Sequence, residues 1–321
     1  MSPRLLLLLI PTLVCAAPCT TATTNCTEWL TLGKSARSLI YRSHPLDQKN
    51  ENIRRALIMV HGAGRDADNY FRTALAAAFL GGALDDTVVI SPRFASNDGR
   101  SCKDTLASEE VNWSCSGDSW RSGGVAISNG TLTSYDFTDE LLRKLARKDS
   151  FPNLKMIVVA GHSAGGQYVT RYEMTNQVHE KLGVPVLYVV SNPSSYAYLD
   201  SARPGAENAS CASFDRWPYG MQNRTGYASK LSVEKLKDQL ASRPVVYLLG
   251  ELDTLPLAGF DSSCSAMAQG ASRLARGQAF AAYVKEKYRA QHQVTTVPLC
   301  GHNARCIFTA EPALKVIFPT Q

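Results

Sequence analysis

The sequence predicts one α/β domain, in which helices cover both faces of a doubly wound, mostly parallel sheet. From Arg55 onward, short apolar runs alternate with amphipathic helical stretches, which is the pattern of a parallel sheet covered by helices. The hydrophobic content of 45% is that of an ordinary globular chain with a packed core. No internal repeat or linker is visible. We therefore expect a single domain over residues 18–321.

The strands are predicted from short apolar runs, and the helices from apolar residues that recur every three or four positions. The predicted strands are Ala56–Val60, Thr87–Ile90, Met156–Val159, Val186–Val190, Val245–Leu249 and Val294–Val297. The predicted helices are Asp68–Leu80, Phe137–Leu145, Gln167–Leu182, Val233–Leu240, Leu274–Tyr288 and a short one from about Pro312.

Two long irregular segments, at about 91–130 and 191–230, interrupt this alternation. The first is rich in Gly, Ser and polar residues, so we expect it to lie outside the core and over one edge of the sheet. Aromatic residues in both segments either line a pocket or pack the segments onto the body. They are Trp113, Trp120, Tyr196, Tyr198, Trp217 and Tyr219.

The N-terminus has the order of a secretory signal peptide, predicted to span residues 1–17. Arg4 precedes the apolar stretch Leu5–Val14, and the small residues Cys15–Ala17 follow it. The stretch is interrupted by Pro11 and is shorter than the roughly 20 residues that span a bilayer, so we expect no stable membrane insertion. The mature protein is predicted to be secreted and extracellular.

Removal of the signal peptide leaves an even number of cysteines, which in a secreted chain favours disulfides. The alternative of a zinc site lacks a C-x-x-C or His/Cys spacing. Pairing of cysteines near in sequence is the simplest assumption. The expected pairs are Cys19 with Cys26, Cys102 with Cys115, Cys211 with Cys264, and Cys300 with Cys306.

The net charge of +6 comes from 34 basic and 28 acidic residues that are interspersed along the chain. No basic run of the kind that binds nucleic acid is present, so we expect no nucleic-acid partner. Sequons in polar stretches predict glycosylation if the host is eukaryotic. They begin at Asn25, Asn112, Asn129, Asn208 and Asn223.

One motif carries the chemistry: G-x-S-x-G at Gly161–Gly165, between a predicted strand and a predicted helix. The flanking glycines allow a sharp turn that lifts the hydroxyl of Ser163 above the sheet. The helix that follows directs its positive end at the same place, which favours an oxyanion there. The alternative is a simple Gly-rich turn, but the strand-to-helix context favours a nucleophile.

With this motif and context, residues from about Ala56 to Phe318 resemble the α/β-hydrolase superfamily. The resemblance implies the chain order Ser, acid, His, with the acid after a later strand and the histidine after the last one. Asp253 follows the strand that ends at Leu249 and matches the acid position, with Glu251 as its competitor. His302, in a Gly-His pair after the last predicted strand, matches the family's histidine.

The other histidines are assigned less chemistry. We expect His44, His179 and His292 to be solvated, and His162 to be a packing residue inside the turn. The resemblance also implies an oxyanion hole, formed by the backbone N–H groups of Ala63 and Ala164. A disulfide between Cys300 and Cys306 would limit the motion of His302 or simply stabilise a surface turn.

The resemblance therefore predicts a serine hydrolase that cleaves a small-molecule or polymer-borne carboxylic ester through an acyl-enzyme on Ser163. His302 is the expected general base and Asp253 the residue that orients it. No cofactor or metal is needed. Two alternatives stay open: a serine carboxypeptidase-type peptidase and a catalytically silent binding module.

Overall fold

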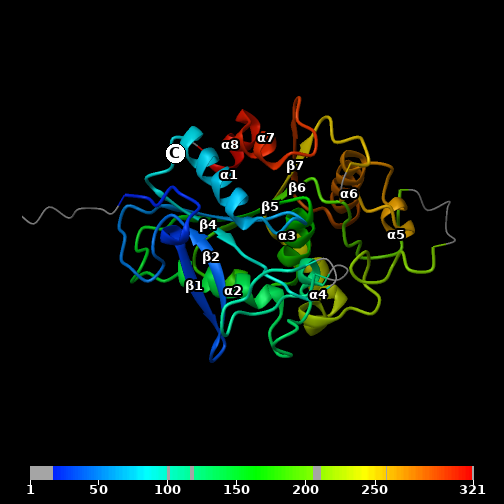
Figure 1. The fold of residues 1–321 in the computed structure, drawn as a ribbon. Coiled ribbons are helices and arrows are strands. Elements are labelled where there is room, and N and C mark those ends of the chain that lie inside the picture. Colours follow the sequence, from blue (N-terminus) through cyan, green and yellow to red (C-terminus); the bar gives the residue numbers. More distant parts are fainter. Residues whose placement is uncertain (1–16, 100–101, 116–118, 205–210, 258, 320–321) are drawn as a thin grey trace, which may run out of the picture.

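A computed structural model of the chain describes residues 17–99, 102–115, 119–204, 211–257 and 259–319. Its centre is an eight-stranded sheet in the order β1-β2-β4-β3-β5-β6-β7-β8 (Figure 1). The strands are β1 Thr27–Leu32, β2 Ala36–Arg42, β3 Arg55–Val60, β4 Thr87–Pro92, β5 Met156–His162, β6 Val186–Ser191, β7 Val245–Gly250 and β8 Gln293–Val297. Strands β3 to β8 run parallel. The doubly wound, mostly parallel sheet is confirmed.

The N-terminal hairpin of β1 and β2 was not predicted. It pairs antiparallel within itself, and β2 adds antiparallel to β4, so it forms one edge of the sheet. Along β1 the buried residues Leu30 and Leu32 alternate with exposed ones, which is the period of a strand with one covered face. The run is short and mixed in polarity, so it lacks the continuous apolar character from which the other strands are predicted.

Helices cover the sheet on both faces. They are α1 Ala67–Leu80, α2 Ser134–Leu145, α3 Ala164–Thr175, α4 Val233–Ser242, α5 Cys264–Met267, α6 Arg273–Tyr288, α7 Ala304–Thr309 and α8 Glu311–Ile317. Short 3-10 helices lie at Thr24–Cys26, Trp120–Ser122, His179–Lys181 and Gly226–Lys230. In Figure 1, α1, α7 and α8 lie together on one side of the sheet, with α2, α3 and α4 on the other.

The sheet separates two hydrophobic cores. Along β3, Ile58 and Val60 pack into one core and Leu57 and Met59 into the other, because successive side chains of a strand point to opposite faces. The first core holds Phe137, Tyr168, Leu236 and Phe280 from α2, α3, α4 and α6; the second holds Phe71, Ile307 and Ile317 from α1, α7 and α8.

The predicted helices differ from the observed ones by up to three residues at their ends, and the difference is larger for α3. The prediction Gln167–Leu182 was wrong at both ends, since α3 begins at Ala164 and ends at Thr175. Asn176 ends it with an extended backbone, and its side chain donates to the carbonyl of Tyr172. The short helix predicted from about Pro312 is α8, which begins at Glu311. The helix before it, α7, was not predicted, and an extended Ala310 separates the two.

The expectation that segment 91–130 lies outside the core was wrong. Trp113 and Trp120 are buried, and both rings contact Phe94, with centroids 5.8 and 5.0 Å away. Trp113 Nε1 also donates to Ser38 Oγ over 3.2 Å. The segment's average polarity concealed these aromatic anchors, which bury its apolar side chains against α2 and α3.

The aromatics of segment 191–230 also pack onto the body, one of the two readings that the sequence allowed. Tyr196 stacks on Phe280 of α6 with ring centroids 4.5 Å apart, and Tyr198 packs against the same ring. Trp217 is half-buried and donates to the carbonyl of Ser122, while Tyr219 donates to Asp261. These contacts fix the irregular segment to the first core.

All four cysteine pairs expected from sequence proximity are disulfides in the structure. They are Cys19–Cys26, Cys102–Cys115, Cys211–Cys264 and Cys300–Cys306. The predicted signal peptide, except for Ala17, and the sequon at Asn208 lie outside the described residues. Among the residues that the structure describes, none of the helices is long and apolar enough to traverse a bilayer.

Candidate functional site

Ser163 lies on a sharp turn between β5 and α3, at the carboxyl edge of the sheet. Its backbone has φ 59° and ψ −117°, a conformation that side-chain-bearing residues rarely adopt. The flanking glycines are required by space. A Cβ on Gly165 would lie 2.2 Å from the carbonyl oxygen of Val60, and one on Gly161 would lie 2.3 Å from that of Gly165. The turn is therefore pressed onto the end of β3, and the strain falls on Ser163 itself.

His302 reaches Ser163 from the loop after β8. Its Nε2 lies 2.9 Å from Ser163 Oγ, within hydrogen-bond range. The Cys300–Cys306 disulfide closes a short loop around the histidine, and α7 begins inside this loop, at Ala304. Residues 139 positions apart in the sequence thus meet at one edge of the sheet.

Asp253 completes a hydrogen-bonded chain of three side chains. It follows β7, and its Oδ2 lies 2.7 Å from His302 Nδ1. The same oxygen accepts a hydrogen bond from Asn192 Nδ2, while Oδ1 faces the guanidinium of Arg273 at 3.5 Å. Asp253 is 1% exposed, so its partners are protein groups.

Glu251, the competitor for the acid position, has a different partner. Its Oε2 accepts a hydrogen bond from the backbone N–H of Leu299 over 3.0 Å. Leu299 has a positive φ of 59° and is 81% exposed. Glu251 therefore supports the turn that leads to His302, two residues away from the carboxylate that contacts the imidazole.

The expectation that His44, His179 and His292 are solvated was wrong. His44 is buried beside Ser43 Oγ, and burial lowers its pKa. His179 and His292 are half-buried and lie 3.0 and 2.9 Å from the hydroxyls of Tyr188 and Tyr247. Each is held in the protein body, away from Ser163.

His162 is buried within the turn, next to the imidazole of His302, with ring centroids 4.5 Å apart. Burial, followed by the nearby charges of His302 and Arg273, lowers the pKa of His162 well below its ordinary value. It is therefore a neutral ring that packs against the face of His302. Its Nδ1 lies 3.3 Å from the hydroxyl of Tyr70.

The loop after β3 runs beside Ser163. His61 anchors it: its Nε2 accepts from the N–H of Phe94, so the proton is on Nδ1, which donates to the carbonyl of Gly62 over 2.9 Å. Burial lowers the pKa of His61 to about 4, which keeps this tautomer neutral. A Cβ on Gly62 would lie 3.8 Å from Ser163 Cβ, so the loop is in van der Waals contact range of the serine side chain.

The two amides expected to bind an oxyanion flank Ser163. Ala63 follows Gly62 in this loop and lines the same cleft as Ser163. Ala164 is the first residue of α3, where a helical N–H has no acceptor within its own helix. Both amides thus belong to segments next to the hydroxyl, and the positive end of α3 adds to the field there.

The cleft around Ser163 has a volume of about 610 Å³. One wall is the loop after β3 and the first turns of α1, and the other is the His302 loop and the start of α7. The lining residues are Gly62, Ala63, Gly64, Asp66, Asn69, Tyr70, Arg72, Thr73, His162, Ser163, Gly259, His302, Asn303, Ala304 and Arg305. Most of this lining is polar or small.

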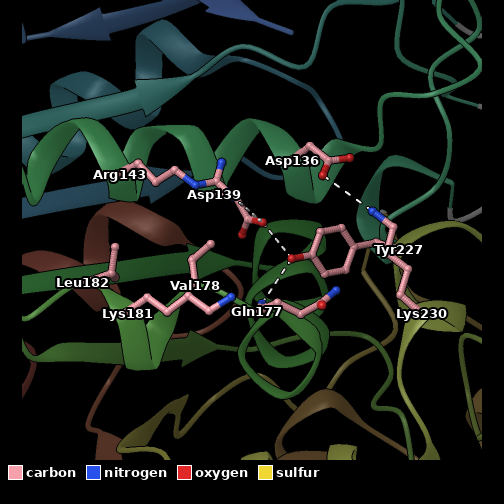
Figure 2. A pocket seen from close by; sticks show the side chains of 9 residues that line it. All are labelled: Asp136, Asp139, Arg143, Gln177, Val178, Lys181, Leu182, Tyr227 and Lys230. Atoms are coloured by element: carbon pink, nitrogen blue, oxygen red, sulfur yellow. Dashed lines mark hydrogen bonds and ion pairs between the residues drawn. The ribbon is translucent and has the colours of Figure 1, made fainter.

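A second cavity of about 510 Å³ lies between α2 and the segments that contain Gln177 and Tyr227 (Figure 2). The buried carboxylate of Asp139 accepts hydrogen bonds from the hydroxyls of Tyr172 and Tyr227, both over 2.7 Å. Lys230 lies 3.7 Å from Asp136 at its rim. None of these residues was predicted to have a function.

Two residues at the Ser163 site were also missed, Asn192 and Arg273. Asn192 follows β6 directly, so it ends a strand at the same edge as the other site residues, and this position is a signal that the sequence contains. Arg273 begins α6, and nothing in the sequence indicates that it contacts Asp253.

Comparison with known proteins agrees with this architecture. The model of the Alpha/beta hydrolase family matches residues 57–316. No curated protein matches the sequence.

Two solved structures share the fold at low sequence identity. A poly(aspartic acid) hydrolase-1 from Sphingomonas sp. KT-1 is 22% identical with a TM-score of 0.64. The match covers 91% of this chain and 97% of the hydrolase. A poly(3-hydroxybutyrate) depolymerase from Bordetella parapertussis is 18% identical with a TM-score of 0.61. The match covers 87% of this chain and 84% of the depolymerase. By its family match and its sheet, the chain belongs to the alpha/beta hydrolase family.

Proposed function

We propose that this hydrolase cleaves carboxylic esters through an acyl-enzyme on Ser163. The observation that carries the proposal is the chain of contacts from Ser163 Oγ to His302 Nε2 at 2.9 Å and from His302 Nδ1 to Asp253 Oδ2 at 2.7 Å. A serine is a weak nucleophile unless an adjacent base takes its proton, and a base oriented by a third group is the arrangement that does so.

In the first half of the reaction, Oγ of Ser163 attacks the ester carbonyl while His302 Nε2 takes its proton. Asp253 holds the proton of His302 on Nδ1 and stabilises the imidazolium that forms. The N–H groups of Ala63 and Ala164 stabilise the oxyanion of the tetrahedral intermediate. His302 then gives its proton to the alcohol oxygen, which leaves.

In the second half, water takes the place of the alcohol. His302 removes a proton from the water as it attacks the acyl-enzyme, and the collapse of the second intermediate releases the acid and restores the hydroxyl of Ser163. The nucleophile, the base, the orienting acid and the oxyanion donors of this cycle are all groups of the chain, and water is the second reactant.

The lining of the cleft favours short or polar acyl groups. Long acyl chains require extended apolar surface, whereas this cleft is lined largely by glycines, short side chains and polar groups such as Asp66, Asn69 and Arg72. The two solved structures described above carry the names of enzymes that act on polymers, so a polymer-borne ester is one form that the substrate can take.

The site is proposed to work outside the cell. The four disulfides and the apolar N-terminal stretch support export, since disulfides persist in oxidising compartments. The sequons at Asn25, Asn112, Asn129, Asn208 and Asn223 are the proposed glycosylation positions.

Labelling with a fluorophosphonate tests the nucleophile, and a panel of substrates tests the reaction. We expect the label on Ser163, established by peptide mass, and turnover of p-nitrophenyl acetate and butyrate above that of the palmitate. Turnover of peptides in place of esters would favour a peptidase. Absence of both labelling and turnover in a folded protein would favour a binding module.

A further inference from the structure

Arg273 is a buried cation beside the acid of the proposed triad. Its side chain is fully buried, and its Nη1 lies 3.5 Å from Asp253 Oδ1. The opposite oxygen, Oδ2, already contacts His302 and Asn192. The two carboxylate oxygens of Asp253 therefore face different partners, and the side of Arg273 is the side away from the imidazole.

The position of Arg273 is unfavourable for a cation by itself. It is the first residue of α6, where the helix dipole is positive, and burial removes the hydration that stabilises a charge. Arg276, also buried, lies one turn further along the same helix, and burial lowers its pKa to about 10. A buried cation at this end of a helix is locally unfavourable, and such unfavourable placements are expected near functional groups.

Arg273 and Arg276 have different partners. Arg276 donates to the backbone carbonyls of Gly270, Ser194 and Asp261, which fixes the segments around α5 and α6. Arg273 donates from Nε to Ser194 Oγ over 2.8 Å and turns its charge toward Asp253. These neighbours on one helix thus offer a matched pair, one facing a carboxylate and one facing carbonyls.

The backbone ties the same two elements together. The N–H of Leu274, the residue after Arg273, donates to the carbonyl of Asp253 over 3.2 Å. The start of α6 is therefore held against the Asp253 turn by a backbone bond and an ion pair. Rotation of the carboxylate about its Cβ–Cγ bond would take Oδ1 away from Arg273 and Oδ2 away from His302 together.

We propose that Arg273 is a positioning residue for catalysis, whose charge holds the Asp253 carboxylate in the orientation that directs Oδ2 at His302. This inference rests on the proposed function. It goes beyond it because a serine, a histidine and an acid would suffice without a buried arginine. The alternative is a purely structural arginine that joins α6 to the segment after β6.

A double-mutant cycle between Arg273 and Asp253 separates these roles. Arg273→Met removes the charge and keeps much of the volume. We expect it to lower kcat on p-nitrophenyl butyrate by about 10- to 100-fold with KM within about twofold of the wild type. In an Asp253→Asn background, the same change should alter kcat less than about twofold, because there is no carboxylate to orient. Equal losses in both backgrounds, or unchanged kcat in the first, would overturn the proposal.

Thermal unfolding supplies a second readout of the same pair. Asp253→Asn removes the carboxylate that faces Arg273, whereas the bond from Arg273 to Ser194 is present in either background, so Arg273→Met should lower the Tm less in Asp253→Asn than in the wild type. Arg273→Gln, which removes the charge and keeps a hydrogen-bond donor, supplies the same comparison if Arg273→Met alone does not fold. Equal losses of Tm in the two backgrounds would overturn the ion pair.

Two further variants serve as controls. Arg273→Lys keeps the charge and should retain at least a tenth of the wild-type kcat, and activity no higher than that of Arg273→Met would contradict a role for the charge. Arg276→Met removes the neighbouring buried arginine and should show no coupling to Asp253→Asn. Ser163→Ala tests the proposed function separately. Labelling or turnover retained in this variant would contradict Ser163 as the nucleophile, whereas absence of the coupling alone would contradict only the role of Arg273.

Discussion

The cleft at Ser163 and the cavity beside Asp139 are similar in size and differ in what their buried acids contact. Their volumes are about 610 and 510 Å³, and each adjoins a buried aspartate with two hydrogen-bond donors. The donors to Asp253 include an imidazole that continues to a hydroxyl on a strained turn. The donors to Asp139 are two tyrosines, Tyr172 and Tyr227. These two hydrogen bonds connect α2 with α3 and with the 3-10 helix Gly226–Lys230.

The difference lies in what each arrangement can do with a proton. Burial raises the pKa of Asp139, and burial together with the charge of Asp139 raises the pKa of both tyrosines, so the tyrosine hydroxyls keep their protons and donate to the aspartate. At Ser163 the imidazole lies between a hydroxyl and a carboxylate, which gives a proton a path away from the hydroxyl. A cavity and a buried acid therefore do not indicate catalysis unless a base and a nucleophile continue the chain.

The largest effect is expected from Ser163→Ala. It should lower kcat by about 10⁴-fold or more, because the hydroxyl forms the covalent intermediate, and leave the Tm close to that of the wild type. Steady-state hydrolysis of p-nitrophenyl butyrate measures it, with the exposed Ser229→Ala as a control. Loss of cooperative unfolding in Ser163→Ala would instead assign the serine a structural role.

Asp139→Asn should produce the reverse pattern. Substitution of the carboxylate weakens its hydrogen bonds with Tyr172 and Tyr227, so we expect the free energy of unfolding to fall by about 1–3 kcal/mol. The kcat/KM for the same ester should stay within about twofold. Urea unfolding and steady-state kinetics measure the two quantities. A large loss of kcat/KM at unchanged stability would mean that the second cavity takes part in the reaction.

The Cys300–Cys306 disulfide sharpens the comparison within the Ser163 site. Its replacement by two serines should lower the free energy of unfolding by about 2 kcal/mol, since the closed loop is short. We also expect kcat to fall by several-fold, because His302 lies inside the loop. The Cys19–Cys26 pair, which closes a loop of similar length, is replaced in the same way as the control, and equal kcat losses in both variants would show that the effect is not local.

The smallest effect concerns a third buried carboxyl, Glu173 of α3. Its two oxygens have no hydrogen-bond donor among the described residues, and burial raises its pKa from 4.5 to about 8. Between those pH values the unfolded chain releases the proton that the folded chain keeps, so stability falls as pH rises.

Glu173→Gln has no such proton to lose. We expect its Tm to exceed that of the wild type by about 5 °C more at pH 8 than at pH 5, in thermal scans at both pH values. The exposed Glu286→Gln should show no such trend. A Tm difference between Glu173→Gln and the wild type that is independent of pH would contradict the burial of a neutral carboxyl.

The parallel part of the fold could be predicted because buried parallel strands leave continuous apolar runs in the sequence. The hairpin of β1 and β2 has one covered face, so its apolar residues alternate with polar ones and form no continuous apolar run. The burial of Trp113 and Trp120 could not be predicted from the average polarity of their segment, because burial is decided by partners such as Phe94 that tertiary packing brings together.

The candidate site divides in the same way. Ser163, Asp253 and His302 stand at strand ends in a recognisable order, and the structure brings them within hydrogen-bond distance of one another. The contact of Arg273 with Asp253 depends on how the first turn of α6 docks against the β7 turn, for which local sequence holds no signal. The expectation that His44 is solvated failed for the same reason, since tertiary packing buries it beside Ser43, whose hydroxyl contacts the carbonyl of Thr87 in β4.

Asn192 makes the alignment of two strands part of the chemistry. Its Oδ1 accepts from the N–H of Gly250 and its Nδ2 donates to Asp253, so one side chain measures the offset between the ends of β6 and β7. Ser191 lies opposite Leu248 in that pairing. A shift of a single residue between these strands would move the acid by about 3.3 Å, which is more than a hydrogen bond tolerates. The register of β6 and β7 therefore sets the distance between Asp253 and its partners.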